Sequence, residues 1–82
     1  METTEYGTII GMDQNQVRQN VGNQAILNSR NDIGIVRAMR HYYETKEPVT
    51  IIKLTKGGMA FVRDLYGKEF SVPPTNLDLK RD

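Results

Sequence analysis

Side chains that could bind another molecule gather within ten residues in the middle of the chain. They are Arg37, Arg40, His41, Tyr42, Tyr43 and Lys46. Lys53, Lys56 and Arg63 follow and could extend the same surface. Tyrosine combines apolar area with a hydroxyl, so such a cluster suits the recognition of a protein. The same residue types can bind nucleic acid, because arginine contacts phosphate and tyrosine stacks on unpaired bases.

A purely structural interpretation of Tyr42 and Tyr43 is also open, in which both rings close the core and the neighbouring charges are solvated. Nucleic acid is the weaker of the two ligand predictions, because the net charge is only +1 and Glu44 lies inside the cluster. A protein is therefore the predicted partner and nucleic acid the alternative. The predicted partner-binding residues are Arg37, Arg40, His41, Tyr42, Tyr43 and Arg63.

Residues suited to catalysis are sparse. The absence of cysteine excludes a disulfide framework and a sulfur-based zinc site, and a single histidine excludes multi-histidine metal sites. His41, beside Arg37 and Arg40, is typical of a solvated surface residue. Residues 55–58, Thr-Lys-Gly-Gly, lack the order of a phosphate-binding loop and indicate a β-turn. We predict a non-enzymatic protein with no catalytic residue, cofactor or metal.

Length and composition indicate one small globular domain. The chain has 82 residues, of which 38% are hydrophobic and 26% charged. No run approaches the roughly 18 apolar residues of a membrane-spanning helix. The first five residues are acidic and lack the basic start and apolar stretch of a secretion signal. We expect a cytoplasmic protein that does not enter a membrane.

The last third of the chain predicts a three-stranded antiparallel meander. Residues 49–55, 59–65 and 69–72 are rich in β-branched and aromatic side chains. Glycines at 57, 58 and 67 mark the two turns between them, and Pro73-Pro74 ends the third strand. In the second strand, Met59, Phe61 and Leu65 are expected on one face.

Two earlier segments are less clear. Half of residues 14–31 are Asn or Gln, and Gly22 interrupts a stripe of Val17, Val21 and Ala25, so a loop or frayed helix is favoured there. Residues 30–46 fit a helix with one apolar arc, and Arg37, Arg40, His41 and Glu44 then share the opposite face. Ser29 and Asp32 resemble a capping box at its start. The Ile33-Gly34-Ile35 sequence fits extended chain equally well.

Residues 57–77 resemble the closing half of a bacterial Src-homology-3-like domain. The resemblance rests on the order of Val62-Arg63, Gly67-Lys68, Val72-Pro73 and Leu77. Residues 27–30, Leu-Asn-Ser-Arg, resemble the opening strand of the same family. The resemblance covers about residues 25–79. It implies a short 3₁₀ turn before the leucine, and recognition of a ligand or protein rather than catalysis.

A meander alone has two open edges, which curling into a small barrel with earlier strands would remove. We therefore predict a mainly β, Src-homology-3-like barrel over residues 25–82. Residues 1–24 would form an extension with a short strand and the Asn/Gln-rich segment. The alternative is an α+β domain with a helix over 30–46. An exposed edge could pair two copies, so the oligomeric state stays open. The predicted core consists of Ile51 or Ile52, Phe61, Val62, Leu65, Phe70, Val72, Leu77 and Leu79.

Overall fold

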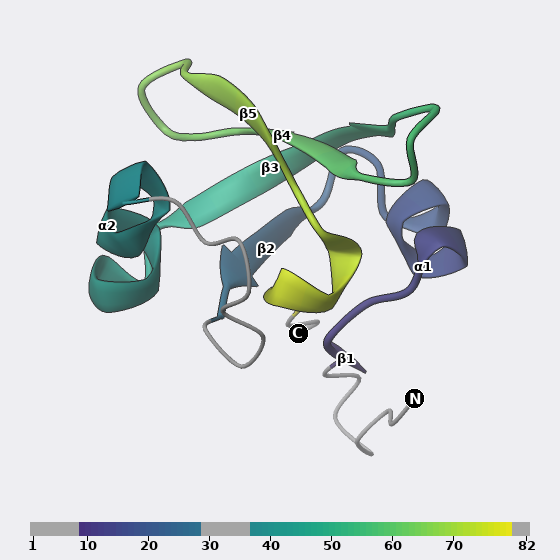
Figure 1. The fold of residues 1–82 in the computed structure, drawn as a ribbon, viewed down its shortest axis with the longest axis horizontal. Coiled ribbons are helices and arrows are strands. Elements are labelled where there is room, and N and C mark those ends of the chain that lie inside the picture. Colours follow the sequence, from purple (N-terminus) through teal and green to yellow (C-terminus); the bar gives the residue numbers. More distant parts are fainter. Residues whose placement is uncertain (1–8, 29–36, 80–82) are drawn as a thin grey trace.

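The computed structural model describes residues 9–28 and 37–79 (Figure 1). In chain order its elements are β1 (Ile9–Ile10), α1 (Gln14–Gln19), β2 (Gln24–Leu27), α2 (Arg37–Thr45), β3 (Pro48–Leu54), β4 (Ala60–Arg63), β5 (Glu69–Val72), the 3₁₀ turn η1 (Pro74–Asn76) and β6 (Leu77–Leu79). The predicted mainly β fold is confirmed, and so are the meander and its two turns.

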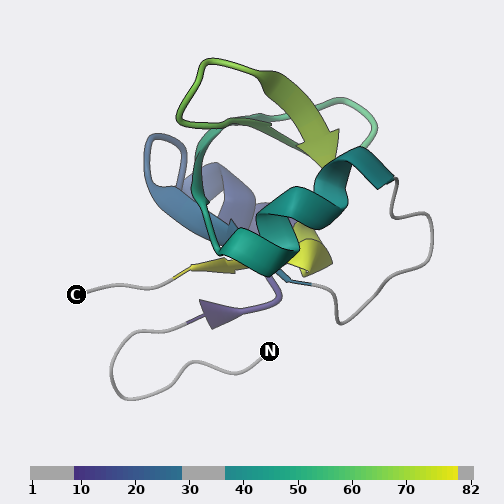
Figure 2. The same cartoon turned by 90° about the vertical axis from the view of Figure 1, so that its left-hand side faces the viewer.

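The six strands form one antiparallel sheet in the order β1-β6-β2-β3-β4-β5. Figure 2 shows this sheet bending over, with β4 and β5 above and β6 and β1 below. The two helices lie at opposite sides of the sheet (Figure 1). Strands β1 and β5 stand at the two ends of the order. Closure into a barrel therefore stays a prediction.

Strand β6 completes the lower part of the sheet, because it lies between β1 and β2. Its Asp78 accepts hydrogen bonds from the amide of Gly11 (3.0 Å) and from Nδ2 of Asn28 (2.8 Å). Asn76 donates through Nδ2 to the carbonyl of Asn28 at 3.0 Å. These bonds satisfy polar groups where three segments far apart in the sequence converge.

The β3–β4 turn is built around one glycine and one threonine. The amide of Thr55 donates to the carbonyl of Met59 at 2.8 Å, and the Thr55 hydroxyl accepts the amide of Met59 at 3.1 Å. Gly58 closes the turn at φ +84°, in the left-handed region that favours glycine. A side chain there would also displace the amide end of Gln14, which lies against Gly58.

Strand β4 buries only one of the two faces that the predicted core included. Ala60 and Val62 are fully buried, whereas Phe61 is half-buried on the other face. Leu65 lies beyond the strand, in the next turn, and is 58% exposed. The predicted core positions of Phe61 and Leu65 are therefore wrong, because side chains alternate along a strand and Val62 occupies the inner face.

The rest of the predicted core is confirmed: Ile51, Val62, Val72, Leu77 and Leu79 are buried, and Phe70 packs partly buried against them. Further core residues come mainly from earlier segments. They are Met12, Val17, Ala25, Leu27, Tyr42, Val49 and Ala60.

Residues 14–28, the described part of the 14–31 segment, are more regular than the predicted loop or frayed helix. Helix α1 is fixed by a capping box, in which Asp13 Oδ1 accepts the Gln16 amide (2.8 Å) and Gln16 Oε1 accepts the Asp13 amide (2.9 Å). Val17 is buried, whereas Val21 is 51% exposed after the helix has ended. The chain then enters β2, so no helical stripe links Val17 to Ala25.

Helix α2 confirms the helical prediction over Arg37–Thr45. The proposed capping box at Ser29 and Asp32 lies outside the described residues. Tyr42 is buried, and Met39 and Tyr43 pack partly buried against the core. Arg40, His41 and Glu44 are exposed, as the predicted helical pattern requires.

Candidate functional site

Tyr42, the centre of the predicted binding cluster, faces inward and is only 5% exposed. Its hydroxyl donates to Asp64 Oδ2 at 2.6 Å. Its ring stacks on Phe70, with the ring centroids 4.9 Å apart. Tyr42 therefore closes the core, as the structural interpretation of this residue predicts. It joins α2 to the β4–β5 hairpin.

Asp64 is the other half of this junction. Its Oδ1 accepts the amides of Tyr66 and Lys68, both at 2.8 Å, and so holds the β4–β5 turn. The Tyr42 hydrogen bond is the main cause that lowers the pKa of the Asp64 carboxyl, and the two amides and the Lys68 charge act in the same direction. Burial, with the hydrogen bond and charge of Asp64, raises the pKa of Tyr42 to about 12.

The remaining predicted site residues are spread over different places. On α2, Arg40 is exposed, and the exposed His41 contacts Glu47 Oε2 through Nε2 at 3.0 Å. Arg37 begins the same helix. Arg63 lies on β4 and pairs with Glu69 of β5 at 2.6 Å. Tyr43 packs partly buried against the core. The predicted cationic and aromatic cluster is thus divided between the core, the outer side of α2 and an ion pair on the sheet.

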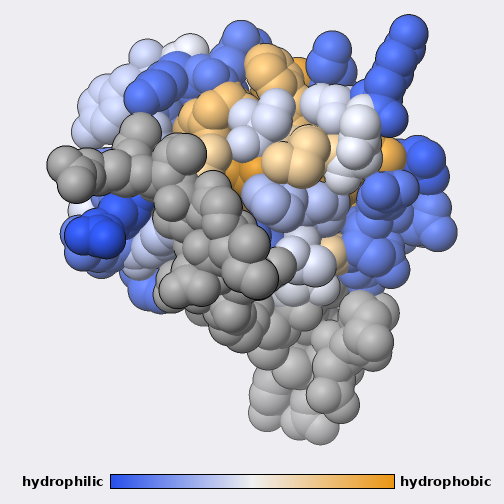
Figure 3. Space-filling model, viewed as in Figure 1, coloured by the Kyte–Doolittle hydropathy of each residue, from blue (hydrophilic) through white to orange (hydrophobic). Residues whose placement is uncertain are grey.

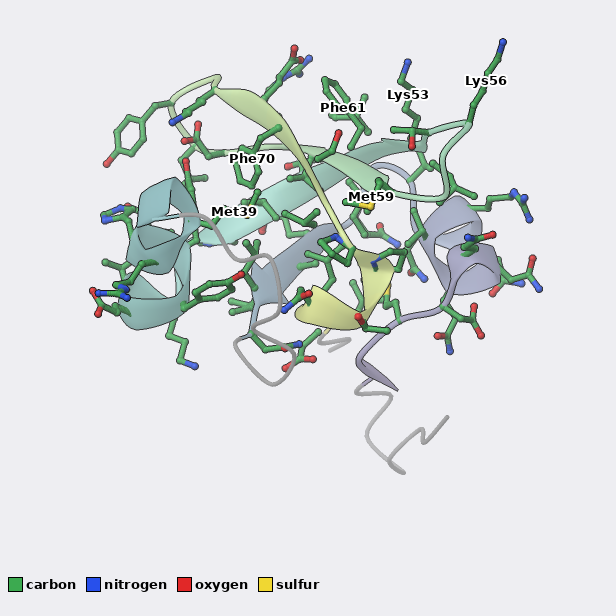
Figure 4. All side chains as sticks on the ribbon, viewed as in Figure 1. Met39, Lys53, Lys56, Met59, Phe61 and Phe70 are labelled. Atoms are coloured by element: carbon green, nitrogen blue, oxygen red, sulfur yellow. The ribbon has the colours of Figure 1, made fainter. Side chains whose placement is uncertain are left out.

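A different surface gathers partly exposed apolar side chains around β5. The β5 surface consists of Met39, Met59, Phe61 and Phe70, all of intermediate exposure. Figure 3 shows apolar side chains collected on this face, with hydrophilic ones around them. In Figure 4, Phe70 and Met39 lie on one side of the β5 ribbon, and Phe61 and Met59 lie on the other.

A cross-strand row organises the outer part of this surface. Lys53, Phe61 and Ser71 stand side by side on β3, β4 and β5. The Lys53 ammonium lies 5.6 Å from the centroid of the Phe61 ring, within the range of a cation–π contact. On the other side of Phe61, the cross-strand neighbour is the small Ser71. Phe61 is therefore bordered by a cation on one side and by the edge of the sheet on the other.

A β-bulge explains why Lys53 belongs to this row. The β3–β4 register shifts between Ile51 and Lys53, which adds Ile52 as an extra residue. In a regular strand Lys53 would face the core together with the buried Ile51. The bulge re-aims Lys53 to the outer face, beside Phe61. The residue pattern does not indicate that Ile52 is an extra residue. For this reason the sequence did not predict the row of Lys53, Phe61 and Ser71.

A pocket of about 320 Å³ lies between α1 and the β3–β4 turn. It is lined by Gln14, Arg18, Leu54, Thr55, Lys56, Gly57 and Gly58. Two cations and no carboxylate therefore surround it. Lys56 extends from the turn at the upper right of Figure 4, on the same side of the molecule as Lys53.

Within the described ranges, no group of three or more His, Asp or Glu side chains could hold a metal ion. No helix in that part of the chain is long and apolar enough to cross a membrane. Comparison of the chain with family models, curated proteins and solved structures finds no match. The Src-homology-3-like resemblance therefore stays a prediction.

Proposed function

We propose that this chain is a small, non-enzymatic protein-binding module that contacts its partner through the β5 surface. The observation that carries the proposal is the gathering of four partly exposed apolar side chains, two Phe and two Met, on the two sides of the edge strand β5. Aromatic residues and Met are enriched at the centres of protein interfaces. Methionine also adapts its shape to different partners.

The surroundings of the surface support the same function. Lys53 and Lys56 border the apolar side chains. The Arg63–Glu69 ion pair joins β4 and β5, the strands that carry Phe61 and Phe70. An apolar centre with a charged rim is the usual composition of a protein interface. Within the described residues neither Lys53 nor Lys56 forms an ion pair, so both ammonium groups can meet a partner.

The surface rests on a rigid support. The Tyr42 ring stacks on Phe70, and the Tyr42 hydroxyl donates a hydrogen bond to Asp64. Because Phe70 is held in place before any partner binds, little side-chain entropy is lost on association. We therefore propose a supporting role for Tyr42 and a contact role for Phe70.

A random peptide display library tests the proposal. Peptides enriched on the wild-type chain are expected to lose binding to Phe61→Ala and to keep it for Tyr66→Ala. Tyr66 is a matched control, because it is an aromatic residue 80% exposed in the β4–β5 turn, outside the β5 surface. Failure to enrich any peptide, or equal loss in both variants, would contradict the proposal.

The second candidate is a nucleic-acid-binding regulator, favoured by one observation. Lys53 lies over Phe61, and the pocket beside the same sheet carries Arg18 and Lys56. An unpaired base could stack on Phe61 while the cations contact phosphate. Titration with oligothymidine at low and physiological salt separates the two functions, because phosphate contacts weaken steeply as salt is added.

A further inference from the structure

The partner class can be named more closely, on the basis of the proposed function. We propose that the β5 surface binds an extended, acidic peptide segment, which adds to the sheet as a new strand along the outer edge of β5.

Strand β5 lies at one end of the sheet. It is the last strand in the sheet order, and in the described part of the chain it pairs with β4 alone. Four residues, Glu69–Val72, form this edge before Pro73 and Pro74 interrupt regular pairing. An unpaired edge is a template for another extended segment.

The peptide groups of β5 point alternately toward β4 and away from it. The Asp64 amide donates to the Lys68 carbonyl at 2.8 Å, so Asp64 and Lys68 are a hydrogen-bonded pair. Such pairs alternate along an antiparallel ladder. Glu69 and Ser71 are therefore the residues of β5 whose N–H and C=O groups point away from β4. They offer two donors and two acceptors to an added strand.

An added strand would contact apolar side chains on both faces of the sheet beside β5. Beside β5, one face presents Phe70, with Met39 on the same side of the strand in Figure 4. The other face presents Phe61 across the small Ser71. Alternate side chains of an extended segment point to opposite faces, so both sets would find apolar surface.

The excess of basic side chains around β5 favours an acidic segment. Between residues 53 and 72 the basic side chains are Lys53, Lys56, Arg63 and Lys68, against Asp64 and Glu69. Both carboxylates already have partners within the fold, Asp64 in the β4–β5 turn and Glu69 on Arg63. The remaining positive charge favours a segment with acidic side chains and speeds its encounter.

The probes are peptides selected on the wild-type chain from the display library, resynthesised in two N-methylated forms that block alternate amides. A bound strand presents only every second amide to β5. One N-methylated form should therefore lose binding by roughly tenfold or more, while the other keeps it. The unmethylated peptide should slow hydrogen exchange at the amides of Glu69 and Ser71. This arm needs no variant of the protein.

Ser71→Pro provides the complementary test on the protein. Proline removes the outward N–H of Ser71, which the β4–β5 ladder does not use, together with the hydroxyl, and it fixes φ in a range that edge strands tolerate. Binding of the selected peptide should be lost in Ser71→Pro and kept in Ser71→Thr, the matched control that retains the N–H. Amide spectra of both free variants verify the fold, and the N-methylated peptides decide the question if Ser71→Pro unfolds.

Each other outcome contradicts the inference in a recognisable way. Selected peptides that are not acidic overturn the acidic character of the segment, and equal loss of binding in both N-methylated forms overturns strand addition. In either case the protein-binding function stands. A concentration-dependent dimer with the same amides protected makes a second copy the occupant. Saturable binding of oligothymidine with no enriched peptide overturns the inference and the proposed function together.

Discussion

The hydroxyl of Tyr42 and the carboxylate of Asp64 lie 2.6 Å apart and connect two elements that are otherwise separate in the sequence. Tyr42 belongs to α2, and Asp64 opens the turn between β4 and β5. Since the same Tyr42 ring stacks on Phe70, the bond fixes the helix, the turn and the β5 surface relative to one another.

Tyr42→Phe removes this hydrogen bond and keeps the stacking ring. We expect a loss of about 1 kcal/mol in the free energy of unfolding, measured by urea denaturation, because a buried acceptor loses its donor. Tyr66→Phe, which alters an exposed hydroxyl, is the control and should leave stability unchanged. Equal stability of Tyr42→Phe and the wild type would show that the bond does not stabilise the fold.

The free energy of unfolding should also fall at low pH, because Asp64 becomes protonated. The Tyr42 hydrogen bond and two amides hold the pKa of this carboxyl below its ordinary value of 3.8. The resulting stabilisation is complete above the ordinary value and is lost as the pH falls through the lower pKa of the folded state. In urea denaturation at decreasing pH, the stability difference between the wild type and Asp64→Asn should narrow. A difference that stays constant down to the acid limit would contradict this assignment.

Gly67 should tolerate asparagine better than alanine. Its φ of +89° lies in the left-handed region, and no atom would obstruct a Cβ there. Strain alone therefore sets the effect, about 1–2 kcal/mol for Gly67→Ala and less for Gly67→Asn, which visits this region more readily. Melting temperatures of the two variants measure the difference. If both melt at the wild-type temperature, the turn does not depend on this backbone conformation.

The two faces of β4 should respond differently to truncation. Val62 is fully buried, so Val62→Ala should lower the free energy of unfolding by about 2 kcal/mol. Phe61→Ala should cost less, although it removes more atoms, because Phe61 is only half-buried on the outer face. Urea denaturation of both variants tests the register, and the reverse order of effects would place Phe61 in the core.

Much of the meander follows from the sequence, because its turns depend on local chemistry. Gly58 and Gly67 adopt the positive φ angles that only glycine adopts easily, and Pro73-Pro74 mark the end of β5. The faces of β4 were harder to predict, since Ala60 and Val62 alternate with Phe61, and the strand is apolar on both sides. Alternation alone could not decide which set is buried.

The site was predicted less well than the fold. Helical periodicity correctly placed Arg40 and His41 on an exposed face and Tyr42 on an apolar one. The spacing in the sequence nevertheless suggested a single surface, because it does not reveal that Asp64 receives the Tyr42 hydroxyl. The row of Lys53 and Phe61 depends on the bulge in β3, a tertiary feature that residue types do not encode locally.

The position of β6 between β1 and β2 has a consequence for biosynthesis. Ile9 pairs with Leu79 and Ile26 with Asp78, so strands near the start of the described chain pair with the last of the described strands to be synthesised. Until β6 has left the ribosome, β1 and β2 lack the described strand that lies between them. The lower part of the sheet therefore forms after Leu77–Leu79 have been synthesised, and its long-range strand pairs make it slow to assemble.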